Sequence, residues 1–191
     1  MRIKTSGKKP PPPALQPLSP AYERSGVKGF YEKHGAEYRN PHEPVISVIL
    51  ERIVRQSSLD LRRVLDLACG SGEATLVLRS LGAQEINGID PYTGPAYQAR
   101  TGQHAEALTF EAIAAGALSS RQYTLIVCSF ALHLAPVSRL PALAYELSRL
   151  SETMVIVTPH KRPLLKAEWG WSLEEEILVD RVRGRLYRRA S

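Results

Sequence analysis

The sequence predicts a doubly wound α/β domain, with a mostly parallel sheet of seven strands, a C-terminal antiparallel hairpin and helices on both faces. Apolar segments of strand length alternate with helical patterns through the middle of the chain, and such repeated βα units build parallel sheets. The end of the chain instead alternates polar and apolar side chains with a period of two, which is typical of half-buried strands. These two patterns together indicate the fold class.

The individual elements follow from the same periodicities. Strands are expected at about 62–68, 85–90, 105–110, 122–129, 152–158, 172–178 and 181–189. Helices are expected at about 30–38, 44–56, 73–81, 94–101, 111–118 and 138–150, with a turn near 163–168. Pro44 suits the first turn of its helix, where a missing N–H group costs nothing. Segments 122–129 and 152–158 are apolar on both faces, which indicates central strands.

The last two strands are expected to pair as a hairpin at one edge of the sheet. On the final strand Val182, Gly184 and Leu186 share one face, and the arginines at 181, 183 and 185 share the other. Glu174 and Glu176 of the preceding strand would lie opposite these arginines. Such opposite-charge pairs across strands contribute roughly 0.2–1 kcal/mol each. The pairing offers a structural reason for the arginine cluster.

Length and composition indicate one ordinary globular domain, with 191 residues, of which 43% are hydrophobic and 23% charged. No apolar run approaches the roughly 20 residues of a membrane helix, so no membrane partner is expected. The N-terminus lacks the apolar region of a secretory signal. Cys69 and Cys128 fall in or just after predicted buried strands and do not make a disulfide framework. A cytoplasmic protein with packing thiols and no metal site is expected.

The beginning of the chain differs from the rest. Residues 1–20 hold six of the 14 prolines and are expected to be a disordered, basic tail, because this composition cannot build a packed core. Residues 21–191 are expected to form the domain. Within it, the aromatic and polar segment 21–44 is expected to form a lid or cap.

The net charge of +6 permits a nucleic-acid partner without requiring one. Basic residues gather at the two ends of the chain, namely Arg2, Lys4, Lys8 and Lys9 in the head and Arg181, Arg183, Arg185, Arg188 and Arg189 in the tail. These ends could contact the phosphates of RNA. Charged, solubilising ends are the alternative interpretation.

The most informative stretch runs from Val64 to Thr75 and reads Val-Leu-Asp-Leu-Ala-Cys-Gly-Ser-Gly-Glu-Ala-Thr. It starts as a buried strand, turns tightly at Gly70 and Gly72, and continues as a helix whose N-terminus points at a ligand. Asp90 lies at the tip of the next strand, 20 residues after Gly70. An acid in this place can accept hydrogen bonds from both hydroxyls of a ribose. The two features predict a nucleoside-containing cofactor.

Two classes of cofactor fit a glycine turn followed by a ribose-binding acid. A nicotinamide or flavin dinucleotide favours a third glycine near its pyrophosphate, and Thr75 stands in that position. Asp66, just before the turn, would repel a pyrophosphate but would suit a free amino group. This favours S-adenosylmethionine, whose ammonium needs an acceptor and whose sulfonium is cationic.

The stretch Val-Leu-Asp-Leu-Ala-Cys-Gly-Ser-Gly, together with Ile-Asn-Gly-Ile-Asp ending at Asp90, closely resembles the class I S-adenosylmethionine-dependent methyltransferases. The resemblance covers roughly residues 40–189 and implies a Rossmann-like fold and methyl transfer from that cofactor. It also implies a set of cofactor contacts, namely Asp66, Ala68, Gly70, Gly72, Asp90, Pro91, Glu111 and Ser129, with Tyr31 and Tyr38 as lid aromatics.

Within this resemblance the contacts divide along the cofactor. Asp66 and the backbone at Ala68 and Gly70 would face the methionine part, and Gly72 would permit close approach. Asp90 would hold the ribose hydroxyls, Pro91 would flank the adenine, and Ser129 would line the sulfonium site. Glu111 would lie near the adenine amine, or would simply be an acid at a helix N-terminus. A hydrophobic staple is the alternative role for the lid tyrosines.

Two loops after strands carry candidates for the acceptor side. His133, after the strand at 122–129, is a candidate general base, because a histidine titrates near neutrality. His160 and Arg162, after the strand at 152–158, would form with Lys161 a cationic lip for an acidic or phosphate-bearing substrate. The alternatives are a packing or capping histidine and a plain surface loop.

Three functions remain open. The favoured one is methyl transfer to an oxygen or nitrogen atom of a small molecule. Here Cys-Ser-Phe-Ala follows the strand at 122–129, in place of the Asn/Asp-Pro-Pro-Tyr/Phe motif expected for methylation of amino groups of bases or glutamine. The alternatives are an RNA- or ribosome-associated methyltransferase that uses the basic ends, and a non-catalytic cofactor-binding protein. The sequence leaves the oligomeric state open.

Overall fold

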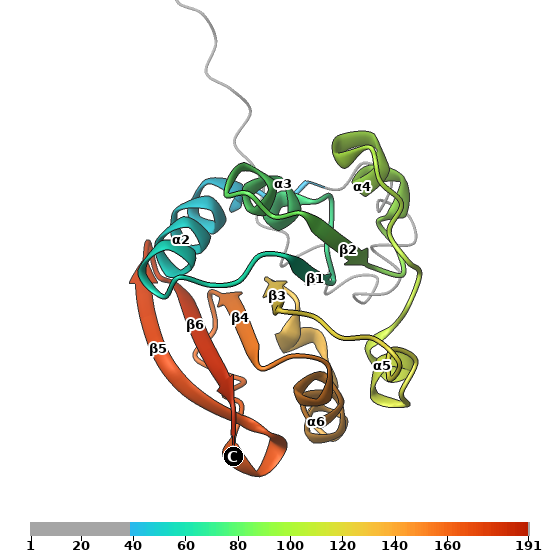
Figure 1. Cartoon of the computed structure of the whole chain (residues 1–191), viewed down its shortest axis with the longest axis vertical. Coiled ribbons are helices and arrows are strands. Elements are labelled where there is room, and N and C mark those ends of the chain that lie inside the picture. Colours follow the sequence, from blue (N-terminus) through green and yellow to red (C-terminus); the bar gives the residue numbers. More distant parts are fainter. Residues whose placement is uncertain (1–38, 191) are drawn as a thin grey trace, which may run out of the picture.

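Figure 1 shows the computed structural model of the protein, which describes residues 39–190. Strands and helices alternate up to β4, and two long strands close the chain. The elements, in order, are α2 (Glu43–Gln56), β1 (Arg63–Leu67), α3 (Glu73–Ser80), β2 (Glu85–Ile89), α4 (Gly94–Thr101), α5 (Phe110–Ala114), β3 (Leu125–Ser129), the 3₁₀ helix η2 (Leu132–Leu134), α6 (Leu140–Leu150), β4 (Thr153–Thr158), the 3₁₀ helix η3 (Ala167–Trp169), β5 (Trp171–Val179) and β6 (Val182–Arg189).

The described strands form one mixed sheet of six, in the order β2-β1-β3-β4-β6-β5. β1 pairs in parallel with β2 and β3, and β3 pairs in parallel with β4. β6 runs antiparallel to both β4 and β5. The α/β class and the C-terminal antiparallel hairpin are therefore confirmed. The strand order reverses at β1, and ligands of open α/β sheets bind in the crevice at such a reversal.

A seventh strand at 105–110 is not found in the described chain. Only Glu106 pairs with the sheet, through hydrogen bonds from its N–H to the carbonyl of Gly88 (2.9 Å) and to its carbonyl from the N–H of Asp90 (3.0 Å). The chain then turns at once. The Thr109 hydroxyl accepts a hydrogen bond from the N–H of Ala112 and caps α5. The cap uses the residues that a longer strand would need, so the expected strand is reduced to one bridge beside β2.

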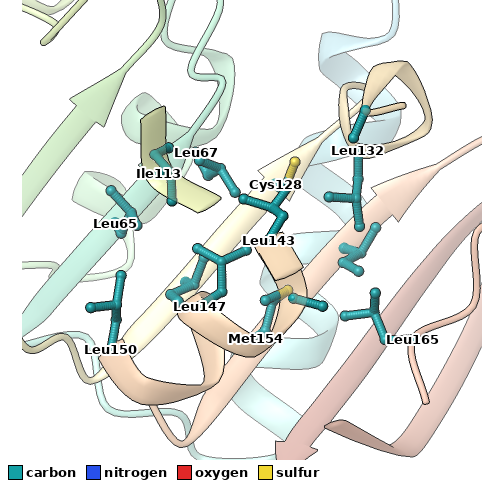
Figure 2. Close-up of a cluster of buried hydrophobic side chains, with 14 of the residues drawn as sticks. Leu65, Leu67, Ile113, Cys128, Leu132, Leu143, Leu147, Leu150, Met154 and Leu165 are labelled. Atoms are coloured by element: carbon teal, nitrogen blue, oxygen red, sulfur yellow. The ribbon is translucent and has the colours of Figure 1, made fainter. Parts of the chain in front are cut away.

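Helices cover both faces of the sheet, as predicted (Figure 1). On one face, apolar side chains of α2 and α3, among them Ile46, Ile49, Leu50 and Leu78, pack with strand residues such as Val155 of β4. On the other face, α5 and α6 pack on the strands through the cluster drawn in Figure 2, which includes Leu65, Leu67, Ile113, Cys128, Leu143, Leu147 and Met154. Cys69 and Cys128 are both free and buried, in accordance with the expected packing thiols.

The hairpin carries ion pairs between glutamates and arginines, but Glu174 pairs with Arg188 and not with an arginine at 181, 183 or 185 as predicted. The Arg185 and Arg188 guanidinium groups lie 2.6 Å from the Glu176 carboxylate and 2.5 Å from the Glu174 carboxylate, respectively. A third arginine, Arg183, lies 3.7 Å from Glu176. Arg183, Arg185 and Arg188 therefore have partners within the fold, which gives a structural reason for most of the arginine cluster.

Arg185 departs from the expected pattern in its burial. The alternation predicts it on the polar face, yet only 2% of its surface is exposed. The loop after β4 covers it, and the guanidinium donates hydrogen bonds to the carbonyls of Lys161 (2.9 Å) and Pro163 (3.1 Å). A long-range contact between loop and hairpin, which periodicity cannot reveal, accounts for the difference.

The N-terminal predictions fall largely outside residues 39–190. This holds for the tail 1–20, for the helix 30–38, and for all but the end of the lid segment 21–44. The helix expected at 44–56 is confirmed as α2, with Pro44 in its first turn. Among the helices of the described part of the chain, none has both the length and the apolar character needed to cross a membrane.

Candidate functional site

A pocket of about 320 Å³ lies at the carboxyl ends of the parallel strands, where the strand order reverses. Four short segments line it. They are the end of β1 with the start of α3, the end of β2 with the following loop, the segment 108–111 before and within α5, and the segment after β3. Asn40, just before α2, adds to the lining.

The turn after β1 brings backbone, rather than large side chains, to the pocket. Ala68 and Gly70 line it with positive φ angles of 55° and 56°. A positive φ is costly for a residue with a Cβ atom, so Ala68 stores strain of about 1–3 kcal/mol. The Gly72 N–H donates to the carbonyl of Cys69 (2.9 Å), and this bond closes the turn.

Gly72 lies outside the pocket lining, although the sequence predicts it as a cofactor contact. Its φ is 90°, and an added Cβ would lie 2.4 Å from Cγ2 of Thr101 and 3.3 Å from the ring of Tyr97. The missing side chain therefore makes room for α4 to pack against the turn. Its role toward the cofactor stays a prediction.

Asp90 spans the gap between the turns that follow β1 and β2. Oδ1 accepts hydrogen bonds from the N–H groups of Tyr92 (2.9 Å) and Thr93 (3.0 Å). Oδ2 accepts a longer hydrogen bond, of 3.3 Å, from the N–H of Gly70. These bonds hold the carboxylate at the pocket wall, as its predicted contact with a ribose requires.

Asp66 lies beneath the pocket rather than in its lining, and its side chain is fully buried. Oδ2 accepts a hydrogen bond of 2.6 Å from the Thr75 hydroxyl, which lies 3.0 Å from the hydroxyl of Tyr97. Oδ1 has no hydrogen-bond partner among the described residues. Burial, reinforced by the nearby Glu73 and opposed by the Thr75 hydrogen bond, raises the pKa of Asp66 to about 7. Its predicted role toward the ammonium stays a prediction.

Glu73 lines the pocket, although the sequence did not predict it as a site residue. It is the first residue of α3, and its side chain is 4% exposed. Its Oε1 accepts hydrogen bonds from the N–H of Asn40 (3.0 Å), the Ser71 hydroxyl and the Arg100 guanidinium (3.1 Å). Arg100 also pairs with Glu43 at 2.5 Å. The available signal was an acid directly after the Gly-Ser-Gly turn, but two of its partners, Asn40 and Arg100, lie far away in sequence.

The residues predicted for the adenine side belong to the pocket lining. Pro91 and Glu111 both line the pocket, as does Tyr92. Leu108 and Phe110 add an apolar surface, which the sequence reading did not assign. A flat apolar surface beside polar groups is the environment that suits a nucleobase.

Ser129, at the end of β3, lines the pocket, and the residues after it are apolar. Phe130, Ala131, Leu134 and Pro136 line this part of the pocket. Phe130 has a positive φ of 55°, which re-aims the chain as it leaves the sheet. The His42 ring stacks on the Phe130 ring at 4.7 Å between centroids, so the start of α2 closes this side.

The structure brings His133 and His160 together, although they follow different strands. Their ring centroids lie 4.2 Å apart. Neither lines the pocket, and Arg162, which is exposed, does not line it either. Nδ1 of His133 is buried, and no residue between 39 and 190 forms a hydrogen bond with it. Burial, together with the charge of His160, lowers the pKa of His133 to about 4, so its imidazole is neutral at pH 7.

Two further predictions concern the lid aromatics and a metal site. Tyr31 and Tyr38, the predicted lid aromatics, lie outside the described residues. No group of three or more potential metal ligands occurs between residues 39 and 190.

Comparisons with known proteins agree with this geometry. Residues 64–153 match the model of a methyltransferase domain family. A Schizosaccharomyces pombe protein of uncharacterized function is 30% identical over 219 residues, which cover 85% of this chain and 88% of the relative. The chain belongs to the class I S-adenosylmethionine-dependent methyltransferases. Its cofactor is S-adenosylmethionine.

Solved structures share the fold at low sequence identity. A magnesium protoporphyrin IX methyltransferase from Synechocystis, crystallised with S-adenosylmethionine, is 16% identical, with a TM-score of 0.60 over 94% of this chain and 100% of that one. An O-methyltransferase family protein from Burkholderia thailandensis has a TM-score of 0.62 at 15% identity, over 91% of this chain and 63% of that one. A putative RNA methyltransferase from Pyrococcus horikoshii has a TM-score of 0.57 at 14% identity, over 81% of this chain and 87% of that one.

The donors and acceptors of the pocket fit this cofactor. The Asp90 carboxylate suits ribose hydroxyls, and the apolar surface of Leu108 and Phe110 suits adenine. The buried carboxylate of Glu73 suits a cationic group. When bound, the cofactor supplies a methyl group that its positive sulfur already activates.

Proposed function

We propose that the protein transfers the methyl group to an oxygen or nitrogen atom of a small molecule. The observation that carries this proposal is the acceptor side of the pocket. It is a compact apolar wall, built by Phe130, Ala131, Leu134 and Pro136, beside the polar Ser129. Such a wall suits a small, partly apolar acceptor, because small-molecule sites are mostly apolar with a few placed polar groups.

The pairing of the C-terminal arginines also favours a small acceptor over RNA. Four tail arginines, Arg183, Arg185, Arg188 and Arg189, form ion pairs with glutamates. Binding to a phosphate backbone needs cationic groups that can release its counterions. Arginines already neutralised within the sheet contribute little to such binding. The basic tail therefore gives weaker support to RNA binding than its sequence suggests.

In this proposal the chain contributes binding and alignment. Asp90 holds the ribose, and the backbone at Ala68 and Gly70 faces the methionine part. The apolar wall after Ser129 excludes water and orients the acceptor atom toward the methyl group. Alignment of two reactants and exclusion of water are the main contributions that a protein makes to such a displacement.

His133 is the proposed base for an acceptor that loses a proton. Its side chain does not line the pocket, but in the sequence it stands between Ala131 and Leu134 of the pocket wall, and its neutral imidazole can accept a proton at pH 7. Its low pKa makes it a weak base, so we expect His133→Ala to lower kcat by about 100-fold, at the lower end for general base catalysis. Steady-state kinetics with the identified acceptor would measure this. Calorimetry should show the same cofactor Kd as in the wild type, and an unchanged kcat would remove His133 from the mechanism.

The acceptor class is tested by the fate of a labelled methyl group. The protein is incubated with methyl-labelled S-adenosylmethionine and, in parallel, with a low-molecular-weight metabolite extract or with total RNA. The expected result is label in the metabolite fraction only. Label in RNA that ribonuclease releases would overturn the proposal and support the RNA alternative, in which binding should weaken steeply between about 50 and 200 mM salt.

A non-catalytic role is distinguished by the same assay. A protein that only binds the cofactor would show a calorimetric Kd for S-adenosylmethionine but no label in either fraction. The wild type and the Asp90→Ala variant form a matched pair for this measurement. The variant should lose cofactor binding, because it removes the acceptor for the ribose hydroxyls.

A further inference from the structure

We infer that Glu73 binds the amino group of S-adenosylmethionine through its free carboxylate oxygen. The inference rests on the cofactor of the family and not on the identity of the proposed acceptor. Glu73 lies directly after the glycine turn. The sequence instead predicted that Asp66, in the strand before the turn, would bind the amino group.

The first observation concerns the two oxygens of the Glu73 carboxylate. Oε1 accepts hydrogen bonds from the N–H of Asn40, the hydroxyl of Ser71 and the guanidinium of Arg100. Oε2 accepts no hydrogen bond from the described residues. An ionised carboxylate offers about four acceptor positions. A side chain that is only 4% exposed, and that lines the pocket, therefore keeps one oxygen available for a donor in the pocket.

The second observation concerns charge. Glu73 and Glu43 share a single cation, Arg100, at 3.1 Å and 2.5 Å. The Glu43 side chain is 39% exposed, so water solvates it, whereas the Glu73 side chain is only 4% exposed. Arg100 is divided between the two and offsets only part of the charge of Glu73, and a cation bound in the pocket would offset the rest. The amino group of the cofactor, when protonated, is a compact cation with three N–H donors.

The third observation is that Asp66 is placed differently. Its carboxyl group lies beneath the pocket and outside the lining, where it bonds to Thr75. Glu73 lies in the lining beside Gly70, whose N–H contacts Asp90 at the ribose side. The glycine turn thus lies between a carboxylate suited to the ribose and a carboxylate suited to the amino group.

The test compares two ligands on two proteins by isothermal titration calorimetry. The ligands are S-adenosylhomocysteine and its analogue without the amino group, 5′-(3-carboxypropylthio)-5′-deoxyadenosine. The wild type should bind the analogue about 10- to 100-fold more weakly, which is the range for one charge-assisted hydrogen bond. Glu73→Gln should bind S-adenosylhomocysteine weakly by a similar factor but should bind the analogue as the wild type does.

Glu43→Gln is the matched control. Glu43 pairs with the same arginine but does not line the pocket, so this variant should bind S-adenosylhomocysteine within about threefold of the wild type. If Glu73→Gln loses affinity for both ligands equally, Glu73 is only structural and the inference is wrong. Equal affinity of the wild type for the two ligands overturns it as well, even if the variant does not fold. Failure of the acceptor assay would leave these binding results unaffected.

Discussion

The buried carboxyl group of Asp66, just before the glycine turn, makes the stability of the fold depend on pH. In the folded state its pKa is raised to about 7, mainly by burial. In an unfolded chain it would be about 3.9. The folded protein therefore holds this proton more tightly than the unfolded chain does. The stabilising effect is complete below about pH 4 and is lost as the pH rises through 7.

The change Asp66→Asn should remove this pH dependence. The free energy of unfolding of the wild type, relative to that of the variant, should fall between pH 4 and pH 8 by at most about 4 kcal/mol, which is 1.36 kcal/mol for each unit of pKa shift. Urea unfolding at several pH values would measure the difference. If the free energy of unfolding varied with pH in the same way for both proteins, Asp66 would have the same pKa in the folded and unfolded states, and the prediction would be wrong.

Gly88 illustrates how a residue without a side chain can be essential to packing. An added Cβ would lie 2.5 Å from Cζ of the Tyr97 ring, which is fully buried. Because the ring cannot move into solvent, Gly88→Ala should destabilise the protein by about 1–3 kcal/mol. Thermal or urea unfolding would measure this.

The control for that prediction is Gly94→Ala. Nothing lies within 4 Å of a Cβ at this position, and its φ is not in the left-handed region. This variant should unfold at or slightly above the wild-type midpoint, since alanine favours a helix. A loss of stability as large as that of Gly88→Ala would contradict the steric explanation.

At the scale of elements, Arg185 joins the C-terminal hairpin to the loop after β4. Its guanidinium bonds to Glu176 and to two loop carbonyls, and it is 2% exposed. Arg185→Gln should therefore destabilise the protein by about 2–4 kcal/mol, because it removes a buried cation and leaves three partly buried acceptors without their donor. Denaturant unfolding would measure the loss.

Arg189 on the same strand offers a matched comparison. Its side chain is 43% exposed and it pairs with Glu152, which is 77% exposed. Surface pairs of this kind contribute about 0–1 kcal/mol, so Arg189→Gln should unfold nearly as the wild type does. Equal losses for the two variants would mean that burial does not determine the strength of these pairs.

At the scale of the whole molecule, cofactor binding should stabilise the domain through mass action. A ligand that binds only the folded state at 100 times its Kd adds about 2.7 kcal/mol to the free energy of unfolding. S-adenosylhomocysteine should therefore raise the urea midpoint of the wild type. Asp90→Ala should show little shift at the same concentration, because the ribose acceptor is absent. An equal shift in both proteins would place the ribose elsewhere.

Much of the fold could be predicted because it depends on local patterns. β1, β2 and β4 and the helices α2, α3 and α4 follow from apolar periodicity, glycine and proline. The strand expected at 105–110 failed because pairing depends on the neighbouring chain, and Thr109 starts a helix there instead. Helix and strand ends also shifted, since caps and partners decide them.

Some residues of the candidate site could likewise be predicted from the sequence, and others could not. Ala68, Gly70 and Asp90 could be placed in the pocket because strand ends in a parallel sheet share one edge. Glu73 and the stacking of His42 on Phe130 could not, because their partners are tens of residues away in sequence. His133 and His160 were each singled out, but their contact depends on the adjacent positions of β3 and β4.

The sequence by itself determined the cofactor class and the general fold, because the glycine turn and the spacing to Asp90 are local constraints on backbone and charge. The tertiary structure alone decided that Glu73 lines the pocket while Asp66 does not, that Arg185 is buried, and which apolar residues line the pocket after Ser129. Burial and the balance of charges are properties of neighbours in space. Periodicity along the chain reports only which face a residue occupies, and it leaves open what covers that face.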